Sequence, residues 1–463
     1  MDDDTVARDL DVSWRRFPSV LRRICGDRLA AATDRRSFGG RGVARWVCCS
    51  GVILAGATAA AAGSATVAAA RAPRFSSDCP GVSGPRNPAN PLGLSTAPGE
   101  DPLNGAQFFV DGPAHGAAAG EIARLLGIDS NVPVGNYLPA FKDNVSWQTF
   151  LTDTVDKKLS SASAADQHNI QLLEKIASEP EAQRISFASS DKGFAPGTPG
   201  GLAAFTNKLF CGNFTADPGT VPIITTYFMH PVLGGCATTK QIEDYMPLFE
   251  QRINAVVSAT GNHAVVYLLE LDAIGSSACM AKHGSLPAWE KMLKYEVDQF
   301  ATIPHAAVYV EGGYSDANTP EYAARMLNAV DVDKIQGFFT NDTHLNWTSH
   351  EIKYGQEISR MTHGAHFIIN TAENGNGPKL NPHPRTQGIE DNCNPPDRGL
   401  GPRPTSDTHV ADVDAYLWTH LPGNSGGTCN GGPPAGQWWP ASAERLAANA
   451  NGKLGPGDPS QPY

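Results

Sequence analysis

Acidic, amide and imidazole side chains follow a series of apolar runs in this sequence, at the point where each run ends. Carboxylates and imidazoles can give or take protons, and amides and hydroxyls can hydrogen-bond a polar ligand. The side chains concerned are those of His230, Glu270, Asp272, Glu311, Thr340, Asn341, Asn370, Thr371 and His420. One or two of these residues would be ordinary strand-end caps. Six successive runs that end in this way predict one shared polar site.

The apolar runs have the length and composition of parallel strands that are covered on both faces. They are residues 221–227, 264–269, 306–310, 335–339, 365–369 and 413–418. Helix-like stretches alternate with them at 240–258, 287–301, 320–330, 349–361 and 440–451. This alternation predicts a parallel α/β sheet or barrel, and in a barrel the carboxyl ends of the strands converge on one rim.

Residues 1–72 differ in composition from the rest of the chain. They contain eleven Arg, seven Asp and no Lys, and residues 46–70 form a Gly/Ala-rich apolar stretch. This order is typical of a secretory signal, with a membrane anchor as the alternative. Residues 34–38, Asp-Arg-Arg-Ser-Phe, resemble the twin-arginine export motif. We therefore expect a bacterial protein that is secreted or held in the cell envelope.

Charge and cysteine content after residue 72 exclude several classes of partner. The remainder has 25 basic and 40 acidic residues, a net charge of −15, which argues against nucleic acid and membrane as partners. Its six cysteines favour disulfides in an exported chain, and they allow fifteen pairings. No CxxC or HExxH motif supports a metal site. We expect a monomer without metal or cofactor.

The remainder of the chain is organised as one large domain. Residues 73–103 are rich in Pro, Gly and Ser and predict an extended lead-in. Residues 104–451 are expected to form the barrel domain, and residues 452–463 a C-terminal tail. Neither an internal repeat nor a low-complexity module marks an accessory binding domain.

Four C-terminal motifs occur in a specific order. They are Cys-Asn-Pro-Pro-Asp-Arg-Gly-Leu-Gly-Pro-Arg-Pro-Thr at 393–405, Val-Asp-Ala-Tyr-Leu-Trp at 413–418, Thr-Cys-Asn-Gly-Gly-Pro at 428–433 and Ala-Gly-Gln-Trp-Trp-Pro at 435–440. This series resembles glycoside hydrolase family 6, the inverting cellulases that include endoglucanases and cellobiohydrolases. Weaker matches lie at 109–111, 176–180, 269–272, 337–341 and 374–378.

The resemblance implies a distorted (β/α) barrel over 104–450 that handles a polysaccharide or oligosaccharide. It also implies two disulfides, Cys236 with Cys279 and Cys393 with Cys429. Cys79 and Cys211 are left as candidates for a third pair.

The resemblance also implies a general acid. The family's donor is the Asp of a Glu-Pro-Asp motif, which here reads Glu270-Leu271-Asp272, so Asp272 inherits that role. Without the family context, the alternative for Asp272 is a strand-end carboxylate that caps the following turn. An inverting glycosidase also needs a base on the opposite face of the sugar, about 6.5–9.5 Å from the acid.

Several family positions that carry charge are changed. Gly235 stands where the family has the Asp of Arg-Asp-Cys, and His420 and Gly426 stand where it has a sugar-contacting Lys and the Asp proposed as base. The family's Asp-Ala-Gly-His segment reads Glu-Gly-Gly-Tyr at 311–314, and an Arg of its Asp-Thr-x-Arg-Asn-Gly segment is Glu373. The residues that we expect to bind substrate are Trp418, Asn341, Asn346, His420, Asn424, Glu311 and Tyr314.

Three hypotheses follow. The first is a glycoside hydrolase for a β-1,4-glucan or related polysaccharide, with Asp272 as acid and a replacement carboxylate such as Glu311 assisting. The second is a non-catalytic glycan-binding protein on the same fold, since a fold does not guarantee chemistry. The third is an enzyme with changed sugar specificity, in which Tyr314, Asn424 and His420 shape a different subsite. A second carboxylate within relay distance of Asp272 would favour an enzyme over a binding protein.

Overall fold

The computed structural model describes residues 79, 81, 91–92, 101–128, 150–191, 193–234, 236–378 and 393–455. The chain divides into two units, Met1–Ala72 and Pro73–Tyr463, and every described residue lies in the second. The predicted export segment, most of the lead-in and residues 456–463 of the tail lie outside the described residues. Of the helices that are described, none has the length and apolarity required to span a membrane.

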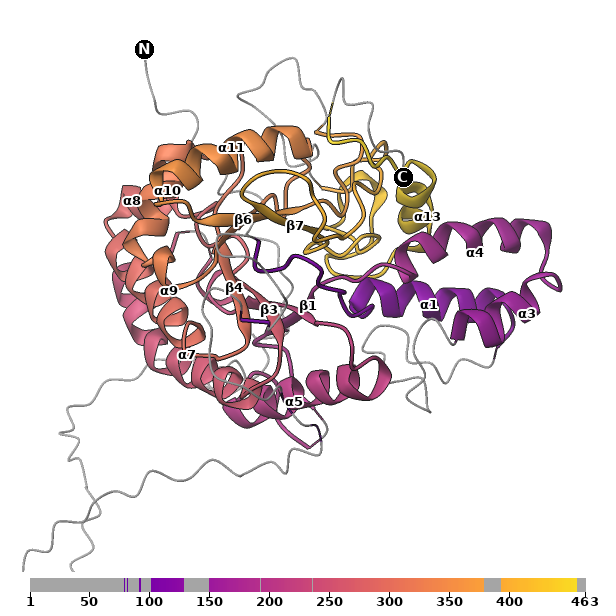
Figure 1. Cartoon of the computed structure of the whole chain (residues 1–463), viewed down its shortest axis with the longest axis horizontal. Coiled ribbons are helices and arrows are strands. Elements are labelled where there is room, and N and C mark those ends of the chain that lie inside the picture. Colours follow the sequence, from indigo (N-terminus) through magenta and orange to yellow (C-terminus); the bar gives the residue numbers. More distant parts are fainter. Residues whose placement is uncertain are drawn as a thin grey trace, which may run out of the picture. The chain divides into compact units, whose positions relative to one another are not determined.

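Seven parallel strands form the centre of the domain (Figure 1). They are β1 (Gln183–Ser186), β2 (Ile223–Tyr227), β3 (Val265–Leu269), β4 (Ala306–Glu311), β5 (Gly337–Thr340), β6 (His366–Asn370) and β7 (Val413–Leu417). They pair in sequence order from β1 to β7. The N–H of Ala182 donates to the carbonyl of Trp418 at 2.8 Å, so the segment before β1 meets the segment after β7. The predicted distorted barrel is confirmed.

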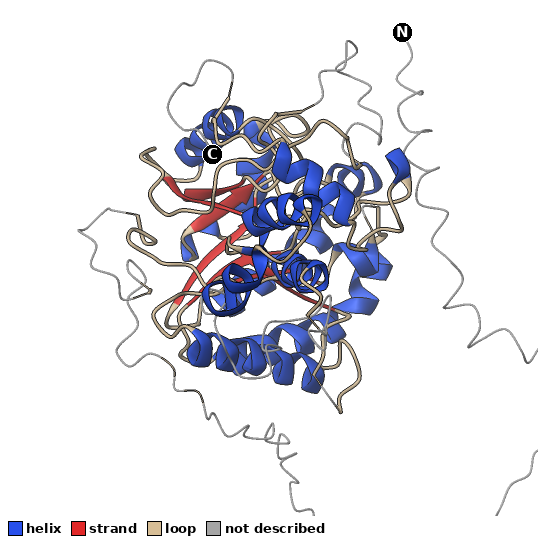
Figure 2. Ribbon diagram, turned by 90° about the vertical axis from the view of Figure 1, so that its right-hand side faces the viewer, coloured by secondary structure: helices blue, strands red, loops and turns tan. Residues whose placement is uncertain are grey.

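Helices connect and cover the strands, as Figure 2 shows with the strands lying inside the helices. They are α1 (Pro113–Leu125), η2 (Leu151–Val155), α3 (Asp156–Leu159), α4 (Ala164–Ala177), α5 (Pro199–Ala216), α6 (His230–Leu233), α7 (Thr239–Thr260), α8 (Ala278–His283), α9 (Leu286–Phe300), α10 (Pro320–Ala329), η3 (Val332–Lys334), α11 (Thr348–Met361), η4 (Cys429–Gly431) and α13 (Pro440–Ala448). All six predicted strands and all five predicted helices are present. The sequence analysis missed β1, the long helices α1, α4 and α5, and the short helices α3, α6 and α8.

Side chains of each strand alternate between two apolar cores. On β3, Tyr267 and Leu269 pack with the helices outside the sheet, whereas Val266 and Leu268 pack inside the barrel. This two-residue period is what a strand covered on both faces requires. A third core joins α1, α4 and α13 and includes Trp418.

Three disulfides stabilise the loops. Cys236 pairs with Cys279 and Cys393 pairs with Cys429, as the resemblance implied, and Cys79 pairs with Cys211. The third bridge spans 132 residues and ties the N-terminal lead-in to α5. Because disulfides persist in oxidising compartments, these bridges fit a protein that works outside the cytoplasm.

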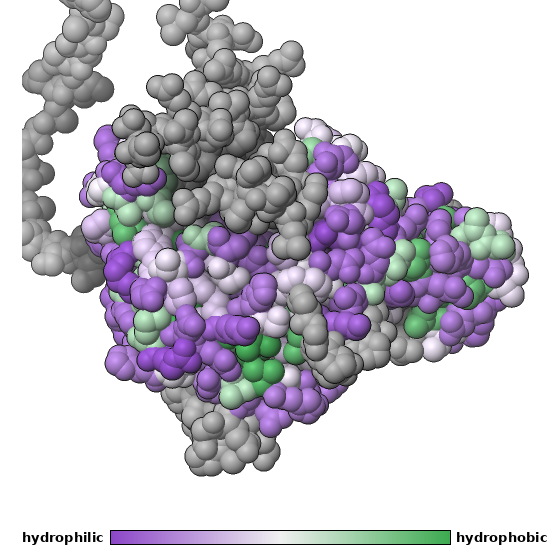
Figure 3. All heavy atoms as spheres, turned by 90° about the horizontal axis from the view of Figure 1, so that it is seen from above, coloured by the Kyte–Doolittle hydropathy of each residue, from purple (hydrophilic) through white to green (hydrophobic). Residues whose placement is uncertain are grey.

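The face of the molecule in Figure 3 is mainly hydrophilic, and its hydrophobic residues form small separate areas. The large hydrophobic side chains that are exposed among the described residues are Phe187, Phe194, Val232, Leu248 and Met361. Both Phe lie in the segment between β1 and α5, and the other three residues lie on α6, α7 and α11.

A cluster of acidic residues lies at the amino ends of β6 and β7, beside a pocket of about 370 Å³. The hydroxyl of Tyr309 donates to Asp414, whose other oxygen lies 2.6 Å from Nδ1 of His366. Asp101, from the lead-in, also hydrogen-bonds Asp414. Burial, and then the charge of Asp414, raises the pKa of Asp101 to about 8.

We expect Asp101→Asn to flatten the dependence of stability on pH. Between about pH 4 and pH 8 folded Asp101 keeps a proton that the unfolded chain releases, so stability falls as pH rises through this window. The variant should therefore unfold at a temperature roughly 2 °C higher than the native protein at pH 8, with no gain at pH 4. Thermal unfolding followed by circular dichroism measures this. The matched control is Asp407→Asn, at an exposed carboxylate of the same pocket; an equal gain in that variant would contradict the prediction.

Candidate functional site

The turn after β3 presents two carboxylates with different surroundings. Glu270 and Asp272 both have a left-handed backbone, with φ of 54° and 65°, which non-glycine residues seldom adopt. Glu270 is fully buried, and its oxygens accept the N–H groups of Phe228 and Met229 at 2.7 and 2.8 Å. Burial raises the pKa of Glu270 to about 7. Glu270 therefore holds the loop after β2, and Asp272, which is partly exposed, is the carboxylate available to a ligand.

Two hydroxyl groups hold one oxygen of the Asp272 carboxylate. Tyr314 donates its hydroxyl hydrogen to Oδ1 of Asp272. Oγ1 of Thr343 lies 2.9 Å from the same oxygen and 3.1 Å from the hydroxyl of Tyr314. Among the residues that the structure describes, none hydrogen-bonds Oδ2 of Asp272. One carboxylate oxygen is thus fixed in place while the other is available to a bound molecule.

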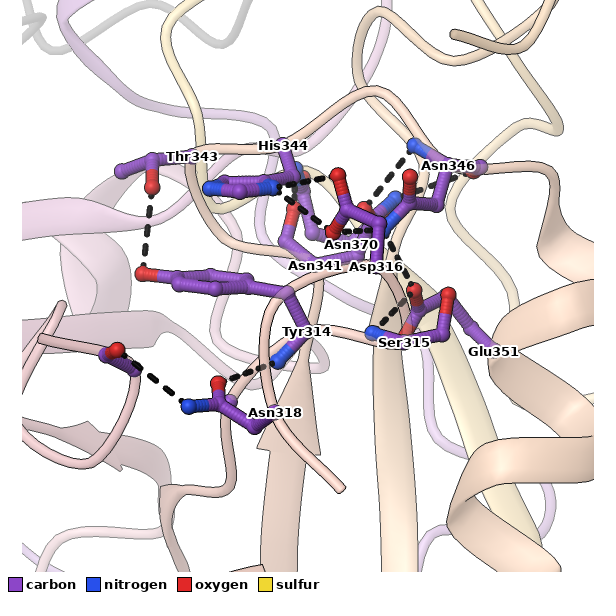
Figure 4. Close-up of polar contacts among 12 residues, drawn as sticks. Tyr314, Ser315, Asp316, Asn318, Asn341, Thr343, His344, Asn346, Glu351 and Asn370 are labelled. Atoms are coloured by element: carbon purple, nitrogen blue, oxygen red, sulfur yellow. Dashed lines mark hydrogen bonds and ion pairs between the residues drawn. The ribbon is translucent and has the colours of Figure 1, made fainter. Parts of the chain in front are cut away.

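Tyr314 is held by loops that follow three neighbouring strands. A Cβ at position 275 would clash with its ring, so the glycine there lets Tyr314 lie against the turn after Asp272. His344 stacks on the ring with centroids 3.9 Å apart and planes 4° apart (Figure 4). Nδ1 of His344 lies 2.8 Å from Oδ1 of Asp316. Burial alone would lower the pKa of His344, but Asp316 outweighs it and the pKa is raised.

Asp342 is a second carboxylate beside Asp272, and the sequence analysis missed it. Its side chain is 1% exposed, and its Oδ2 accepts the backbone N–H of Asp272 at 3.1 Å. Its Oδ1 is buried and has no hydrogen-bond partner in the described part of the chain. Burial, and then the charge of Asp272, raises the pKa of Asp342 to about 7. The sequence did contain one indication of Asp342. It follows directly after Thr340 and Asn341, at the end of a predicted strand.

Glu311 does not take the assisting role that the sequence suggested. It is the last residue of β4 and is fully buried. Its Oε2 accepts the N–H groups of Ile274 and Gly275, and its Oε1 accepts that of Gly313. Burial, and then the charge of Asp342, holds the pKa of Glu311 well above its usual range. Glu311 therefore fixes the loops around Asp272 and has no free oxygen to offer a substrate.

Asn341 and Asn346 are likewise buried, at 0% and 2% exposure, and bind neighbouring loops (Figure 4). The amide of Asn341 donates to the carbonyls of Asn370 and Asn346 at 3.0 and 3.2 Å. That of Asn346 donates to Asp316 and Glu351 at 2.7 and 2.9 Å. The expectation that these two amides contact substrate is not supported by this geometry, in which they join the loops after β4, β5 and β6.

Trp418 was expected to stack on a sugar, and the structure contradicts this. Its side chain is fully buried in the core shared by α1, α4 and α13. Its indole N–H donates to the carbonyl of Pro402 at 3.1 Å. Both faces of the ring are covered by protein, because α1 and α4, which the sequence analysis did not predict, pack against the segment after β7.

The segment after β7 brings His420 to the same end of the sheet. Nδ1 of His420 lies 3.6 Å from Oε1 of Glu373. Burial lowers the pKa of His420, but Glu373 more than offsets this and the pKa is raised. Asn424 lies in the following turn and pairs with Trp438 in an isolated antiparallel bridge. Gly426 is exposed beside the Cys393–Cys429 disulfide, and Gly235 lies outside the described residues.

Arg184 is a positive charge near these carboxylates that the sequence analysis also missed. Its guanidinium lies over the ring of Tyr227, 5.3 Å from the centroid. Its Nε is buried without a hydrogen-bond partner among the described residues. Burial lowers the pKa of Arg184, while the charges of Tyr227, Asp342 and Asp272 act in the opposite direction. The sequence gave little indication of Arg184, because this residue lies on a four-residue strand with little apolar character.

The described residues contain one cluster whose ligand atoms are close enough for a metal ion, formed by Cys236, Cys279 and His283. Both sulfur atoms of that cluster are used in a disulfide, so they are not thiolate ligands. The carboxylates around Asp272 are held by backbone N–H groups and hydroxyls instead.

Comparison with known proteins gives a consistent family. Residues 231–450 match the model of glycosyl hydrolases family 6. Endoglucanase A of Cellulomonas fimi is 29% identical over 309 residues, which are 65% of this chain and 61% of that relative's length. Endoglucanase 1 of a Streptomyces species is 28% identical over 294 residues, 62% of this chain and 74% of the relative.

A solved structure is similar over nearly its whole length. It is an endoglucanase from Mycobacterium tuberculosis in complex with methyl-cellobiosyl-4-deoxy-4-thio-β-D-cellobioside. It is 32% identical to this chain, with a TM-score of 0.50, and the match covers 62% of this chain and 94% of that one. Together with the seven-stranded barrel and the carboxylates at its carboxyl end, this match shows that the chain belongs to glycosyl hydrolases family 6.

Proposed function

We propose that this protein is an exported glycoside hydrolase that cleaves a β-1,4-glucan or a related polysaccharide with inversion, and that Asp272 is its general acid. The observation that carries the proposal is the state of the Asp272 carboxylate. One oxygen is fixed by Tyr314 and Thr343, and the other accepts no hydrogen bond from a described residue. A general acid needs this arrangement, because it must hold its orientation while one oxygen delivers a proton to the leaving group.

Two further features support a hydrolase over a binding protein. Asp342 provides a second carboxylate beside Asp272, although the family carboxylates are replaced at Gly235 and Gly426. The relatives named above are endoglucanases. The substitutions concern groups that help the acid and the base, and in an inverting reaction water is the nucleophile, so a relay can activate it without a dedicated nucleophilic residue.

We place the sugar at the carboxyl ends of the strands, where the partly exposed His420 and Asn424 replace or flank family positions. Tyr314, which was also expected to bind substrate, is 3% exposed and holds Asp272 instead. His420 adds a titratable group at the place of a Lys. This replacement favours a subsite with a different hydrogen-bond pattern from that of the family's cellulases, and hence a related polysaccharide as substrate in place of unmodified cellulose.

The test is release of reducing sugar from a panel of soluble β-glucans and bacterial envelope polysaccharides. Proton NMR of the first products identifies the anomer. We expect release from at least one polymer, and an α-anomer as the first product of a β-linked substrate. Isothermal titration calorimetry measures whether the protein binds the same polymers. Binding without release would refute the hydrolase and favour a glycan-binding protein, and a β-anomer would refute inversion.

A further inference from the structure

Arg184 carries a positive charge that the described part of the chain does not pair. Its Nε is buried without a hydrogen-bond partner, and none of the described carboxylates forms an ion pair or a hydrogen bond with its guanidinium. The side chain as a whole is partly exposed, and its two Nη nitrogens are not fully buried. A largely enclosed charge is costly unless an acceptor pairs with it. The guanidinium of Arg184 is therefore available to an anionic ligand.

The strand pattern directs Arg184 into the barrel and toward its carboxyl end. Ile185, the next residue of β1, packs with the helices outside the sheet, so Arg184 lies on the inner face. Arg184 pairs in register with Thr225 of β2, yet its guanidinium lies over the ring of Tyr227, 5.3 Å from the centroid. Tyr227 is two residues closer to the carboxyl end, where Asp272 also lies. The guanidinium thus points toward the proposed active site.

His420 lies beside Arg184 where the barrel closes. The N–H of Ala182 donates to the carbonyl of Trp418 at 2.8 Å. Arg184 follows Ala182 by two residues, and His420 follows Trp418 by two residues. The two segments leave this contact in the same direction, because all seven strands are parallel. Arg184 and His420 are also close enough for their charges to interact.

The ring of His420 is oriented by Glu373. Nδ1 of His420 is buried and lies 3.6 Å from Oε1 of Glu373, which also accepts the N–H of Gly423 at 3.3 Å. Nε2 of His420 is not fully buried and has no partner in the described segments. Burial lowers the pKa of His420, but Glu373 more than offsets this and the pKa is raised. In mildly acidic solution Nε2 is therefore a charged donor that is open to a ligand.

The acidic groups that act on Arg184 are mostly uncharged at about pH 6. Burial raises the pKa of Glu181 to about 8, and burial, followed by the charge of Asp272, raises that of Asp342 to about 7. Burial also raises the pKa of Tyr227, so its hydroxyl is neutral. Asp272 must itself carry a proton to act as a general acid. In the reactive state Arg184 thus has no counter-ion, and the substrate can supply one.

We propose that Arg184 and His420 form a binding subsite for an anionic group of the sugar chain, and that the substrate is a β-1,4-linked polysaccharide whose sugars bear a carboxylate. The planar guanidinium matches a carboxylate through two parallel hydrogen bonds. A singly charged group suits the subsite better than a doubly charged phosphate, because Asp272 and Glu373 border it. The inference rests on the proposed glycoside hydrolase function and names its class of substrate.

The test measures binding in Asp272→Asn, which should bind oligosaccharides without cleaving them and which reproduces the uncharged state of Asp272. The two probes are cellotetraose and the β-1,4-linked tetramer of glucuronic acid, which differ only in the carboxylate at carbon 6. Isothermal titration calorimetry at about pH 6 and low salt should give a Kd at least about tenfold lower for the acidic tetramer. This preference should shrink as sodium chloride is added, because salt screens the charges.

Further substitutions in the Asp272→Asn background assign the preference to the subsite. Arg184→Gln should weaken binding of the acidic tetramer by about tenfold or more and that of cellotetraose by less than about threefold. Arg184→Lys, which keeps the charge and loses the planar fork, should lie between these limits. His420→Gln should weaken binding of the acidic tetramer by about 2–10-fold. The control is Arg325→Gln, at an exposed position on α10, which should leave both affinities unchanged.

Equal losses for the two tetramers in Arg184→Gln would overturn the proposal, since Arg184 would then only shape the site. Tighter binding of cellotetraose phosphorylated at carbon 6 would overturn the choice of a carboxylate. A cooperative unfolding transition, followed by circular dichroism, verifies that each variant is folded. If Arg184→Gln does not fold, Arg184→Lys and His420→Gln still decide, because unchanged binding of the acidic tetramer in both would overturn the subsite.

The subsite and the hydrolase can fail separately. A protein that prefers the acidic tetramer but releases sugar from no polymer retains the subsite and refutes the hydrolase. Hydrolysis that depends on Asp272, together with equal binding of the two tetramers, retains the hydrolase and refutes the subsite.

Discussion

Asp272→Asn should lower kcat for polysaccharide hydrolysis by about 10²–10⁴-fold, the usual contribution of a positioned acid. An amide cannot supply the proton that the leaving sugar oxygen needs. The rest of the site should be preserved, because Asn has the shape of Asp and its carbonyl oxygen can still accept the hydrogen bonds from Tyr314 and Thr343. Binding of the substrate should therefore remain within about twofold of native, as expected for a group that acts only in the transition state.

Initial rates of reducing-sugar release and calorimetric binding measure these two effects separately. The matched control is Asp333→Asn, an exposed carboxylate in η3, which should keep the native rate. If Asp272→Asn keeps more than a tenth of the native rate, another group is the acid. If rate and binding fall together, Asp272 is needed to hold the substrate.

The barrel could be predicted because its strands are short, continuous apolar runs. In the helices between them, by contrast, apolar residues alternate with polar ones at helical spacing. Residues 264–269, for example, have side chains that are apolar on both faces, which only a covered parallel strand requires. β1 could not be predicted in this way, since Gln183, Arg184 and Ser186 make three of its four residues polar. That strand forms because β2 pairs with it and because Ala182 reaches the segment after β7.

The sequence predicted where the site lies in the fold better than it predicted what each of its residues does. A residue that follows a strand lies at the carboxyl end of the barrel, and Asp272, Glu311 and Asn341 were all located correctly by that rule. Whether such a residue faces a ligand depends on loops that are distant in sequence. Glu311 is covered by the N–H groups of residues 274 and 275, which belong to the previous strand's loop. No local pattern in the sequence encodes that contact.

Asp342 was missed for a related reason. The segment Thr340-Asn341-Asp342-Thr343 reads as an ordinary polar turn, in which any one side chain could bind backbone or solvent. Its importance comes from the turn after β3, where the N–H of Asp272 points at the Asp342 carboxylate because Asp272 has a left-handed backbone. The relation between the two carboxylates is thus a property of two neighbouring loops and was not visible in either segment alone.

The second large effect concerns stability. Trp418→Ala should lower the free energy of unfolding by about 3–5 kcal/mol, the usual result when a large aromatic side chain is removed from a core. The ring is fully buried against residues of α1, α4 and α13, and truncation also removes the hydrogen bond to Pro402. Trp418→Phe should lower the free energy of unfolding by less, because much of the buried apolar surface remains. Urea unfolding followed by far-ultraviolet circular dichroism measures these differences.

The same variants test whether Trp418 is a core residue or stacks on the sugar. A Trp that stacked on substrate would raise KM on truncation and leave stability nearly unchanged, since an exposed ring contributes little to folding. We expect the reverse for Trp418→Phe, namely a measurable loss of stability with a KM close to native. Trp439→Ala is the control, because that ring is partly exposed under Arg445 and should cost less than about 1 kcal/mol. A rise in KM for Trp418→Phe without a loss of stability would mean that the segment after β7 opens to present Trp418 to the glycan.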